Sequence, residues 1–198
     1  MGGCIVKLGG SLADALIDLV PVLLESKEGM LIVPGGGAGA DAVRSLDPDP
    51  DTAHWMAIAA MEHYGHHIAS FGIPSVDRLI RVDQPSVLLP YCLLRNEDPL
   101  PHSWDITSDT IAAWVAWRLN LPLIILKSVD GVISSGRVLS QVYEPLETDT
   151  VDPALIPYIL QKGLYATVQN GRKNECVRRA LSGDYSQGTC ITSRTEEL

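Results

Sequence analysis

The chain has 198 residues, 46% of them hydrophobic, and a formal net charge of −9. One sizeable core can be buried at this length, and the acidic balance argues against sequence-independent nucleic-acid binding, which needs clustered lysine and arginine. The cysteines lack metal-ligand spacing, the N-terminus lacks a signal-peptide pattern, and no apolar stretch of about 18 residues occurs, so we expect a cytoplasmic protein without a disulfide framework or membrane span.

The first third of the chain alternates strands, glycine-rich turns and helices. We predict strands over 4–7 and 30–33, each followed by such a turn, with helices over 12–25 and from the second turn to about residue 46. Ser11 is the expected N-cap of the first helix. This alternation predicts an α/β fold, a three-layer α/β/α sandwich around a mainly parallel sheet.

The middle of the chain contains a clear break and an irregular region. Two prolines between residues 47 and 51 end the preceding helix, and Asp51 or Thr52 can cap a long helix predicted over 53–71. Short strands are expected near 79–82 and 87–89 within the proline-dotted stretch that follows. A further helix is then predicted from Thr107 or Ser108 to about residue 119.

The last third repeats the strand and helix alternation. We predict a strongly apolar strand over 123–126 and a hairpin over 130–138. A strand over 165–168, a helix over 174–181 and a final strand over 189–192 complete the sequence-based assignment.

The two glycine-rich turns are candidate sites for anionic groups. Glycine lets the backbone approach a ligand closely, and the free N–H groups at a helix start favour phosphate. A glycine turn can also be only a tight connection. Lys7, however, ends an apolar strand at the sheet edge where ligands bind in open α/β folds. Together these features predict one cradle for a donor phosphate and one for an acceptor phosphate.

Three charged residues fit phosphoryl transfer, which needs positioning and charge neutralisation rather than a covalent nucleophile. Lys127 ends the most apolar strand as Lys7 ends the first, and Asp109 lies in the first turn of a helix, where it could orient both lysines. The alternatives are snorkelling surface lysines and a carboxylate that only stabilises a helix N-terminus. A P-loop and the protein-kinase signatures are absent, which excludes both classes at motif level.

Four ordered segments resemble the amino acid kinase superfamily, which includes acetylglutamate, uridylate, aspartate, carbamate and isopentenyl phosphate kinases. They are Lys7-Leu8-Gly9-Gly10-Ser11, Pro34-Gly35-Gly36-Gly37, Ser108-Asp109 and Val129-Asp130-Gly131-Val132. The similarity spans nearly the whole chain. It implies the amino acid kinase fold, ATP and Mg²⁺ as cofactors, a small-molecule phosphate acceptor and a homo-oligomer.

Residues 53–58, 101–109 and 126–131 are similar to the short branch of this superfamily that acts on an aminomethylfuran phosphate in methanofuran biosynthesis. That similarity implies a diphosphate product and one kinase domain over 1–198, with an acceptor-side lobe (1–120) and an ATP-side lobe (121–198). Alternatives are a kinase for isopentenyl phosphate, UMP or acetylglutamate, and a non-catalytic nucleotide- or oxyanion-binding relative. A Rossmann-type oxidoreductase is disfavoured because the glycines do not form G-x-G-x-x-G.

The resemblance also implies roles for individual residues. The catalytic residues would be Lys7, Asp109 and Lys127, the ATP-binding residues Gly9, Gly10, Ser11, Ser128, Asp130, Gly131, Val132 and Lys162, and the acceptor-facing glycines Gly35, Gly36 and Gly37. Many superfamily members have Thr-Asp or Ser-Asp where this chain has Lys127-Ser128, which leaves Lys162 as the alternative second catalytic lysine.

The remaining acceptor candidates follow from side-chain chemistry. Arg44 can grip a phosphate bidentately or form a surface ion pair. Trp104 and Asp105 can recognise a flat ring and an ammonium group, although Trp104 can equally be core packing. His63, His66 and His67 lack a fourth ligand at readable spacing, so we predict no protein-built metal site and expect Mg²⁺ to be held mainly by ATP phosphates.

Overall fold

The computed structural model describes residues 3–193. Its strands are β1 (Cys4–Leu8), β2 (Met30–Pro34), β3 (Ser75–Val76), β4 (Pro85–Leu88), β5 (Leu123–Lys127), β6 (Ile133–Ser134), β7 (Arg137–Val138), β8 (Gln141–Val142), β9 (Tyr165–Asn170) and β10 (Thr189–Thr192). Its helices are the 3₁₀ helix η1 (Gly10–Ala15), α1 (Leu16–Leu24), α2 (Gly37–Leu46), α3 (Pro50–Ala69), α4 (Tyr91–Glu97), α5 (Ser108–Leu119), α6 (Leu155–Lys162) and α7 (Asn174–Leu181).

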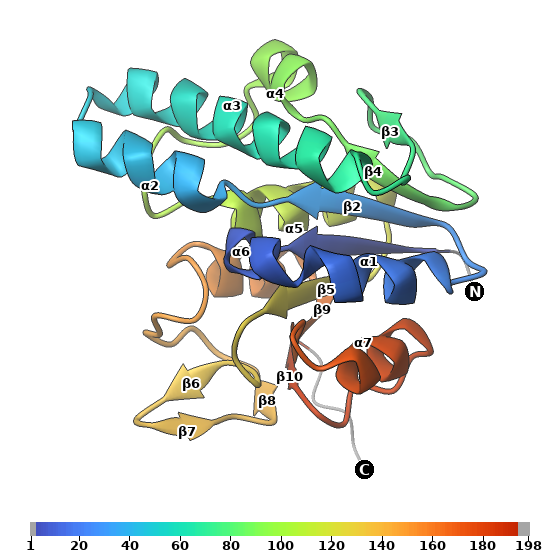
Figure 1. Ribbon diagram of the computed structural model, residues 1–198. Coiled ribbons are helices and arrows are strands. Elements are labelled where there is room, and N and C mark those ends of the chain that lie inside the picture. Colours follow the sequence, from blue (N-terminus) through green and yellow to red (C-terminus); the bar gives the residue numbers. More distant parts are fainter. Residues whose placement is uncertain (1–2, 194–198) are drawn as a thin grey trace.

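The central sheet follows the order β3-β4-β2-β1-β5-β9-β10-β8, with β6 and β7 as a separate hairpin (Figure 1). Its pairs are parallel except β9 with β10. Lys7 is in register with Val33 on one side and Ile125 on the other. The carboxyl ends of β1, β2 and β5 therefore reach the same edge of the sheet, and the turns that follow them meet there.

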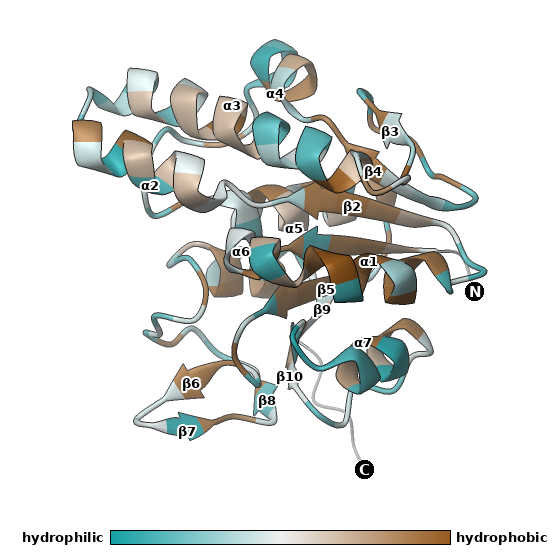
Figure 2. Cartoon of the chain, viewed as in Figure 1, coloured by the Kyte–Doolittle hydropathy of each residue, from teal (hydrophilic) through white to brown (hydrophobic). Residues whose placement is uncertain are grey.

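Side-chain alternation along the strands fills two cores, one on each face of the sheet. Ile5 belongs to the core covered by α5 and α6, whereas its neighbour Val6 belongs to the core covered by α1 and α7. The central strands are accordingly apolar along most of their length, while α7 presents many hydrophilic residues (Figure 2). Apolar residues from α3 reach both cores. The predicted three-layer α/β/α sandwich is confirmed.

Helix starts differ in detail from the sequence-based prediction. The segment after β1 begins as the 3₁₀ helix η1 and becomes α-helical only at Leu16, and Ser11 makes no capping bond there. Helix α3 begins at Pro50, and its cap is Asp49, whose carboxylate accepts the Thr52 N–H at 3.1 Å. Proline fits the first helical position because its missing N–H would have no partner there. The cap is therefore the residue directly before Pro50, and not Asp51 or Thr52.

The region between 72 and 101 holds the largest errors. The strand predicted near 79–82 is wrong, since the structure has β3 and β4 on either side of that stretch. Helix α4 follows β4 and was not predicted. Two elements further along the chain, β8 and α6, were not predicted either. The start of α4 depends on a distant residue, because the Glu62 carboxylate accepts the Tyr91 N–H at 2.6 Å. The predicted elements in the first and last thirds otherwise agree with the structure.

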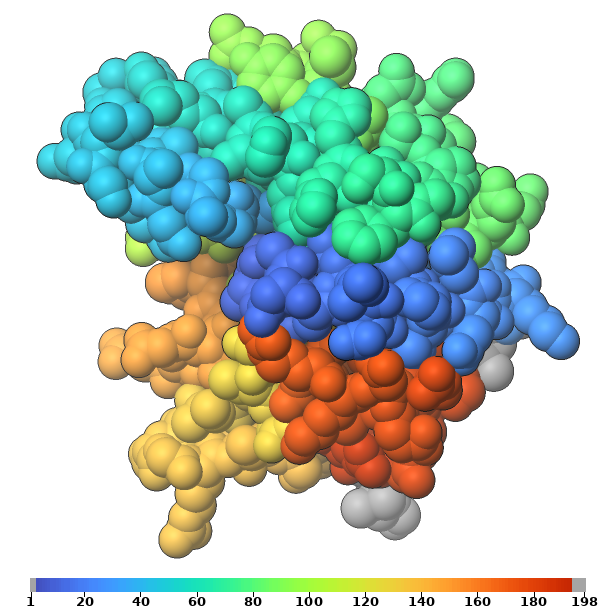
Figure 3. Space-filling view, viewed as in Figure 1, coloured from blue at the N-terminus to red at the C-terminus, as the bar shows by residue number. Residues whose placement is uncertain are grey.

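Helices α2 and α3 pack together and extend past the carboxyl edge of the sheet (Figure 1). The segment between β8 and α6 projects on the same side, below them, and the space-filling view shows the molecule hollowed between these two projections (Figure 3). Within residues 3–193, no helix combines the length and apolar character required to cross a bilayer.

Candidate active site

A cleft of about 850 Å³ opens at the carboxyl edge of the sheet. Its floor comes from the two glycine-rich turns and the start of α5, one wall from α2 and α3, and the opposite wall from residues 148–153. Ligands of open α/β sheets bind at this edge. The cleft is therefore the candidate active site.

Two lysines and one aspartate meet on the floor of the cleft. Lys7 Nζ lies 2.5 Å from Asp109 Oδ1, and Lys127 Nζ lies 2.6 Å from Asp109 Oδ2. The Asp109 side chain is 2% exposed, that of Lys7 4% and that of Lys127 19%. The strand ends and the first turn of α5 thus bring together the three residues predicted to be catalytic.

This triad carries two positive charges against one negative charge. Burial by itself would raise the pKa of Asp109, but the ammonium groups of Lys7 and Lys127 outweigh it and hold that pKa below its ordinary value. Burial lowers the pKa of Lys7, while Asp109 acts in the opposite sense. The ammonium groups of Lys7 and Lys127 both line the cleft, where they can attract an anionic ligand.

The two glycine-rich turns touch each other beside this triad. A Cβ on Gly10 would lie 2.1 Å from the Gly37 Cα, and one on Gly35 would lie 2.8 Å from the Gly10 nitrogen. Gly37 has a φ of 53°, a left-handed conformation that favours glycine. The turns thus form one continuous backbone surface, with Gly36 and Gly37 lining the cleft and Gly35 just beneath it.

Gly10→Ala is expected to lower both stability and ligand affinity, because its methyl group meets backbone atoms that cannot rotate away. Overpacking of this kind costs about 1–3 kcal/mol of unfolding free energy. Denaturant unfolding and a nucleotide titration would measure the two losses. Gly136→Ala is the control for ligand affinity, since no heavy atom lies within 4 Å of its added Cβ and Gly136 does not line the cleft. Its φ of 75° adds backbone strain that Gly10 does not have, so this variant can lose stability but should keep its nucleotide affinity. Unchanged stability and affinity in Gly10→Ala would contradict tight contact between the turns.

Asp152 is a site residue that the sequence did not reveal. Its carboxylate is buried and accepts hydrogen bonds from the backbone and side chains of Thr107 and Thr110, on either side of Asp109. In sequence it lies more than 40 residues away, in an otherwise acidic loop, so local pattern offered no signal for it.

Arg44 and Trp104 meet at the mouth of the cleft. The Arg44 Cζ lies 4.4 Å from the centroid of the Trp104 ring, and Nη1 lies 3.7 Å from Asp41 Oδ1. Trp104 is 37% exposed, so it is a platform for the guanidinium rather than core packing. Asp105 does not line the cleft, and its backbone carbonyl accepts the Ala154 N–H.

Two histidines line the cleft, His54 on α3 and His102 in the loop after α4. His102 bonds Asp51 through Nδ1 at 2.7 Å and Asp98 through Nε2 at 2.9 Å, and its ring stacks on His54 at 3.8 Å. The hydrogen bonds to Asp98 and Asp51 raise the pKa of His102. Burial, with the nearby His102, lowers the pKa of His54 to about 4. The cluster thus ties the starts of α3 and the 102–106 loop to the end of α4.

These histidines also bear on metal binding. Among residues 3–193, one group of potential ligand atoms lies close enough together to hold an ion, namely His54, Asp98 and His102. Both nitrogens of His102 are already bonded and the two rings lie face to face, which suits a hydrogen-bond clamp better than coordination. The group does not include His63, His66 or His67.

Of the residues predicted to bind ATP, Gly9, Gly10 and Ser11 line the cleft, whereas those after Lys127 lie next to it. Ser128, Asp130, Gly131 and Val132 follow Lys127 directly but do not line the cleft. Asp130 Oδ1 accepts from Asn170 at 2.8 Å and from Lys173 at 2.5 Å. The Val132 N–H donates to Thr189 Oγ1 at 2.8 Å, which anchors this loop to β10.

The structure does not bring Lys162 to the site. It ends α6, at the edge of the sheet opposite the cleft, with Nζ 4.3 Å from the centroid of Trp117. Lys127, in contact with Asp109, is the second lysine of the triad.

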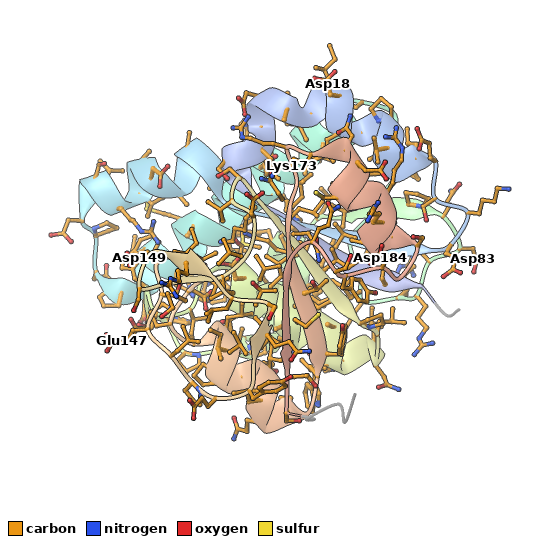
Figure 4. All side chains as sticks on the ribbon, turned by 90° about the horizontal axis from the view of Figure 1, so that it is seen from below. Asp18, Asp83, Glu147, Asp149, Lys173 and Asp184 are labelled. Carbon is orange, nitrogen blue, oxygen red and sulfur yellow. The ribbon has the colours of Figure 1, made fainter. Side chains whose placement is uncertain are left out.

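Two further basic residues follow β9 at the cleft edge and were missed in the sequence. Arg172 bonds the Ser11 carbonyl at 2.8 Å and the Asp14 carboxylate, so it fixes the segment after the first glycine turn. Lys173, labelled in Figure 4, pairs with Asp130 between α1 and α7. Their place directly after a strand that ends at the same edge as β1 was the available signal.

The fold agrees with comparisons to known proteins. The family model described as the amino acid kinase family matches residues 2–156, and the chain belongs to this family. It is a phosphotransferase, and the expectation that it is an enzyme is confirmed.

The chain is also similar to individual proteins. The chain is 31% identical to [5-(aminomethyl)furan-3-yl]methyl phosphate kinase of Methanocaldococcus jannaschii, over 94% of this chain and 96% of the relative. Its fold is similar to that of isopentenyl phosphate kinase, with a TM-score of 0.67 and 17% identity over 96% of this chain and 100% of the other. It is also similar to the UMP kinase of Bacillus anthracis, with a TM-score of 0.71 and 15% identity over 98% and 96% of the two chains.

Proposed function

We propose that this enzyme transfers the γ-phosphoryl group of ATP to a small acceptor that already carries a phosphate, and that the acceptor is [5-(aminomethyl)furan-3-yl]methyl phosphate. The observation that carries this proposal is the Lys7–Asp109–Lys127 triad beside two touching glycine turns. An acceptor phosphate oxygen attacks the γ-phosphorus, the bond to the β-phosphate oxygen breaks, and the products are ADP and the diphosphate.

The residues of this chain supply positioning and charge. Lys7 and Lys127 neutralise charge on the transferring group, and Asp109 holds both ammonium groups in place. The backbone of Gly9, Gly10 and the following helix faces the donor phosphates. The backbone at Gly36 and Gly37 faces the acceptor, with Arg44 as a further phosphate contact at the cleft mouth. In this arrangement ATP lies toward residues 121–198, the segment predicted to form the ATP-side lobe.

The distribution of charge along the cleft supports an acceptor with a cationic end. The ammonium groups of Lys7 and Lys127 lie on its floor, whereas Asp41, Asp47 and Asp149 line it together with the guanidinium of Arg44. Asp149 and Glu147 project from the loop below α2 (Figure 4). An aminomethyl ammonium group would be attracted to this mouth while the phosphate reaches the floor. Isopentenyl phosphate and UMP have no ammonium group to place there.

Mg²⁺ fits this site as an ion bound to the ATP phosphates rather than to protein side chains. Both oxygens of Asp109 are engaged by ammonium groups, so that carboxylate is not free to ligate a metal. The ion would be held by phosphate oxygens and water, and it would supply further neutralisation of phosphate charge.

An acceptor series tests the proposal. With Mg-ATP, kcat/KM for the aminomethylfuran phosphate should exceed that for its hydroxymethyl analogue, isopentenyl phosphate, UMP and acetylglutamate by about 100-fold or more, because a site built to pair an ammonium group rejects analogues lacking it. ADP release and mass spectrometry of the diphosphate provide the measurement. Equal turnover of the hydroxymethyl analogue would rule out this acceptor. Binding of Mg-ATP without ADP release for any acceptor would favour a non-catalytic nucleotide-binding role.

A further inference from the structure

The carboxylate of Asp152 holds together the segment that carries Asp109. Asp152 lies between β8 and α6 and is 8% exposed. Its Oδ2 accepts the N–H and Oγ1–H of Thr107 at 2.8 and 2.9 Å and the N–H of Thr110 at 3.0 Å. Its Oδ1 accepts the Oγ1–H of Thr110 at 2.5 Å. One buried carboxylate thus accepts four hydrogen bonds from two residues that flank Asp109.

These bonds replace a local helix cap. The first N–H groups of an α-helix have no partner within the helix, and a side chain at the N-cap usually accepts one of them. At the start of α5, the Thr107 side chain makes no such bond and instead donates to Asp152. The Ala154 N–H also donates to the Asp105 carbonyl at 3.1 Å. Residues 152–154 therefore hold residues 105–110 in place through these hydrogen bonds, and we call this segment the brace.

The brace is anchored on its other side to the β6–β7 hairpin. Thr148 Oγ1 donates to the Ile133 carbonyl at 2.7 Å, and the Ile133 N–H donates to Thr150 Oγ1 at 3.0 Å. The loop that ends in Asp152 is consequently fixed at both ends and forms one wall of the cleft. The hydrogen bonds of Asp152 run to the two threonines and not to the lysines. Its negative charge also acts on Lys7, where it opposes the burial that lowers the pKa of that lysine.

We propose that Asp152 is a positioning residue for phosphoryl transfer, which fixes the first turn of α5 and thereby the orientation of Asp109 between Lys7 and Lys127. This inference rests on the proposed function. Asp109 must present one oxygen to each lysine at the same time, and a small rotation of the first helical turn would break one of the two contacts. Misplacement of a reacting group by about 1 Å can cost on the order of 100-fold in rate.

Asp152→Asn provides the test, because the amide keeps the shape of the side chain but replaces one acceptor oxygen with a donor. The expected result is a kcat lowered by about 10- to 100-fold, with KM for ATP and acceptor changed by less than about threefold. Amide hydrogen exchange at Thr107 and Thr110 should accelerate in the same variant, because both N–H groups donate to Asp152. Hydrogen exchange therefore measures the loss of these hydrogen bonds independently of enzyme activity.

Two matched variants separate positioning from general destabilisation. Glu144→Gln removes an exposed carboxylate from the same loop, away from the cleft lining, and should leave kcat and exchange unchanged. Ile68→Val removes a buried methyl group from α3 and should lower the melting temperature without lowering kcat. An Asp152→Asn enzyme with full kcat, or a loss of kcat matched by Ile68→Val, would overturn the positioning role. Failure of the proposed function would look different, since the wild type itself would then show no ADP release.

Discussion

Lys7→Met is expected to lower kcat by about 10³-fold, the upper range for removal of one preorganised charge at a reacting centre. The melting temperature should not fall in the same variant. Burial already disfavours the charged form of Lys7, methionine has a similar length without the charge, and Asp109 keeps Lys127 as its partner. Steady-state kinetics and thermal unfolding would measure the two effects separately.

Lys27→Met is the control for this change. Lys27 is exposed in the connection between α1 and β2, at the edge of the sheet away from the cleft, so its removal should leave both measurements unchanged. Undiminished ADP release by Lys7→Met would exclude the proposed role of Lys7. A large fall in melting temperature would instead mean that the Lys7–Asp109 pair is mainly structural.

Asp109→Asn is expected to damage stability as well as activity. It leaves two ammonium groups facing each other with no carboxylate between them, and breaking a buried pair in this way costs about 3–5 kcal/mol of unfolding free energy. The pKa of Lys7, already lowered by burial, should fall further without Asp109. Denaturant unfolding of wild type and variant would measure the loss, with Asp18→Asn as the exposed control.

The pH dependence of this loss identifies its cause. The lysines hold the folded-state pKa of Asp109 below its ordinary value of 3.8. The stability contributed by its ionised form is therefore present above pH 3.8 and is lost as the pH falls through the lower folded-state value. The difference between wild type and Asp109→Asn should be largest near neutral pH and shrink below pH 3.8. A difference independent of pH would point to packing rather than charge.

The sequence predicted the parts of the fold that follow from local pattern. Apolar runs ending in Lys7 and Lys127 marked the central strands, and glycine turns marked where the chain crosses the sheet edge. Because parallel strands bring such ends together, the triad with Asp109 was predictable before any coordinates were known. Acceptor identity, magnesium, cytoplasmic location and oligomeric state stay predictions.

The parts that were missed depend on contacts between distant residues. Helix α4 starts where Glu62 accepts the Tyr91 N–H, and the start of α5 relies on Asp152 instead of a neighbouring cap. Lys162 was a plausible second catalytic lysine by sequence, yet its helix ends at the wrong edge of the sheet. Local periodicity carries no information on which edge a short helix will approach.

The close approach of Gly10 to Gly37 limits how the specificity of this enzyme can be altered. A Cβ on Gly10, Gly35 or Gly36 would lie within 3.0 Å of another heavy atom, so a library that varies these glycines would lose stability in most of its members. Variation of the α2–α3 wall and the 102–106 loop changes the mouth of the cleft while the floor with its glycine turns and lysines stays intact. A redesign for a larger or uncharged acceptor would therefore begin at Asp41, Arg44 and Trp104.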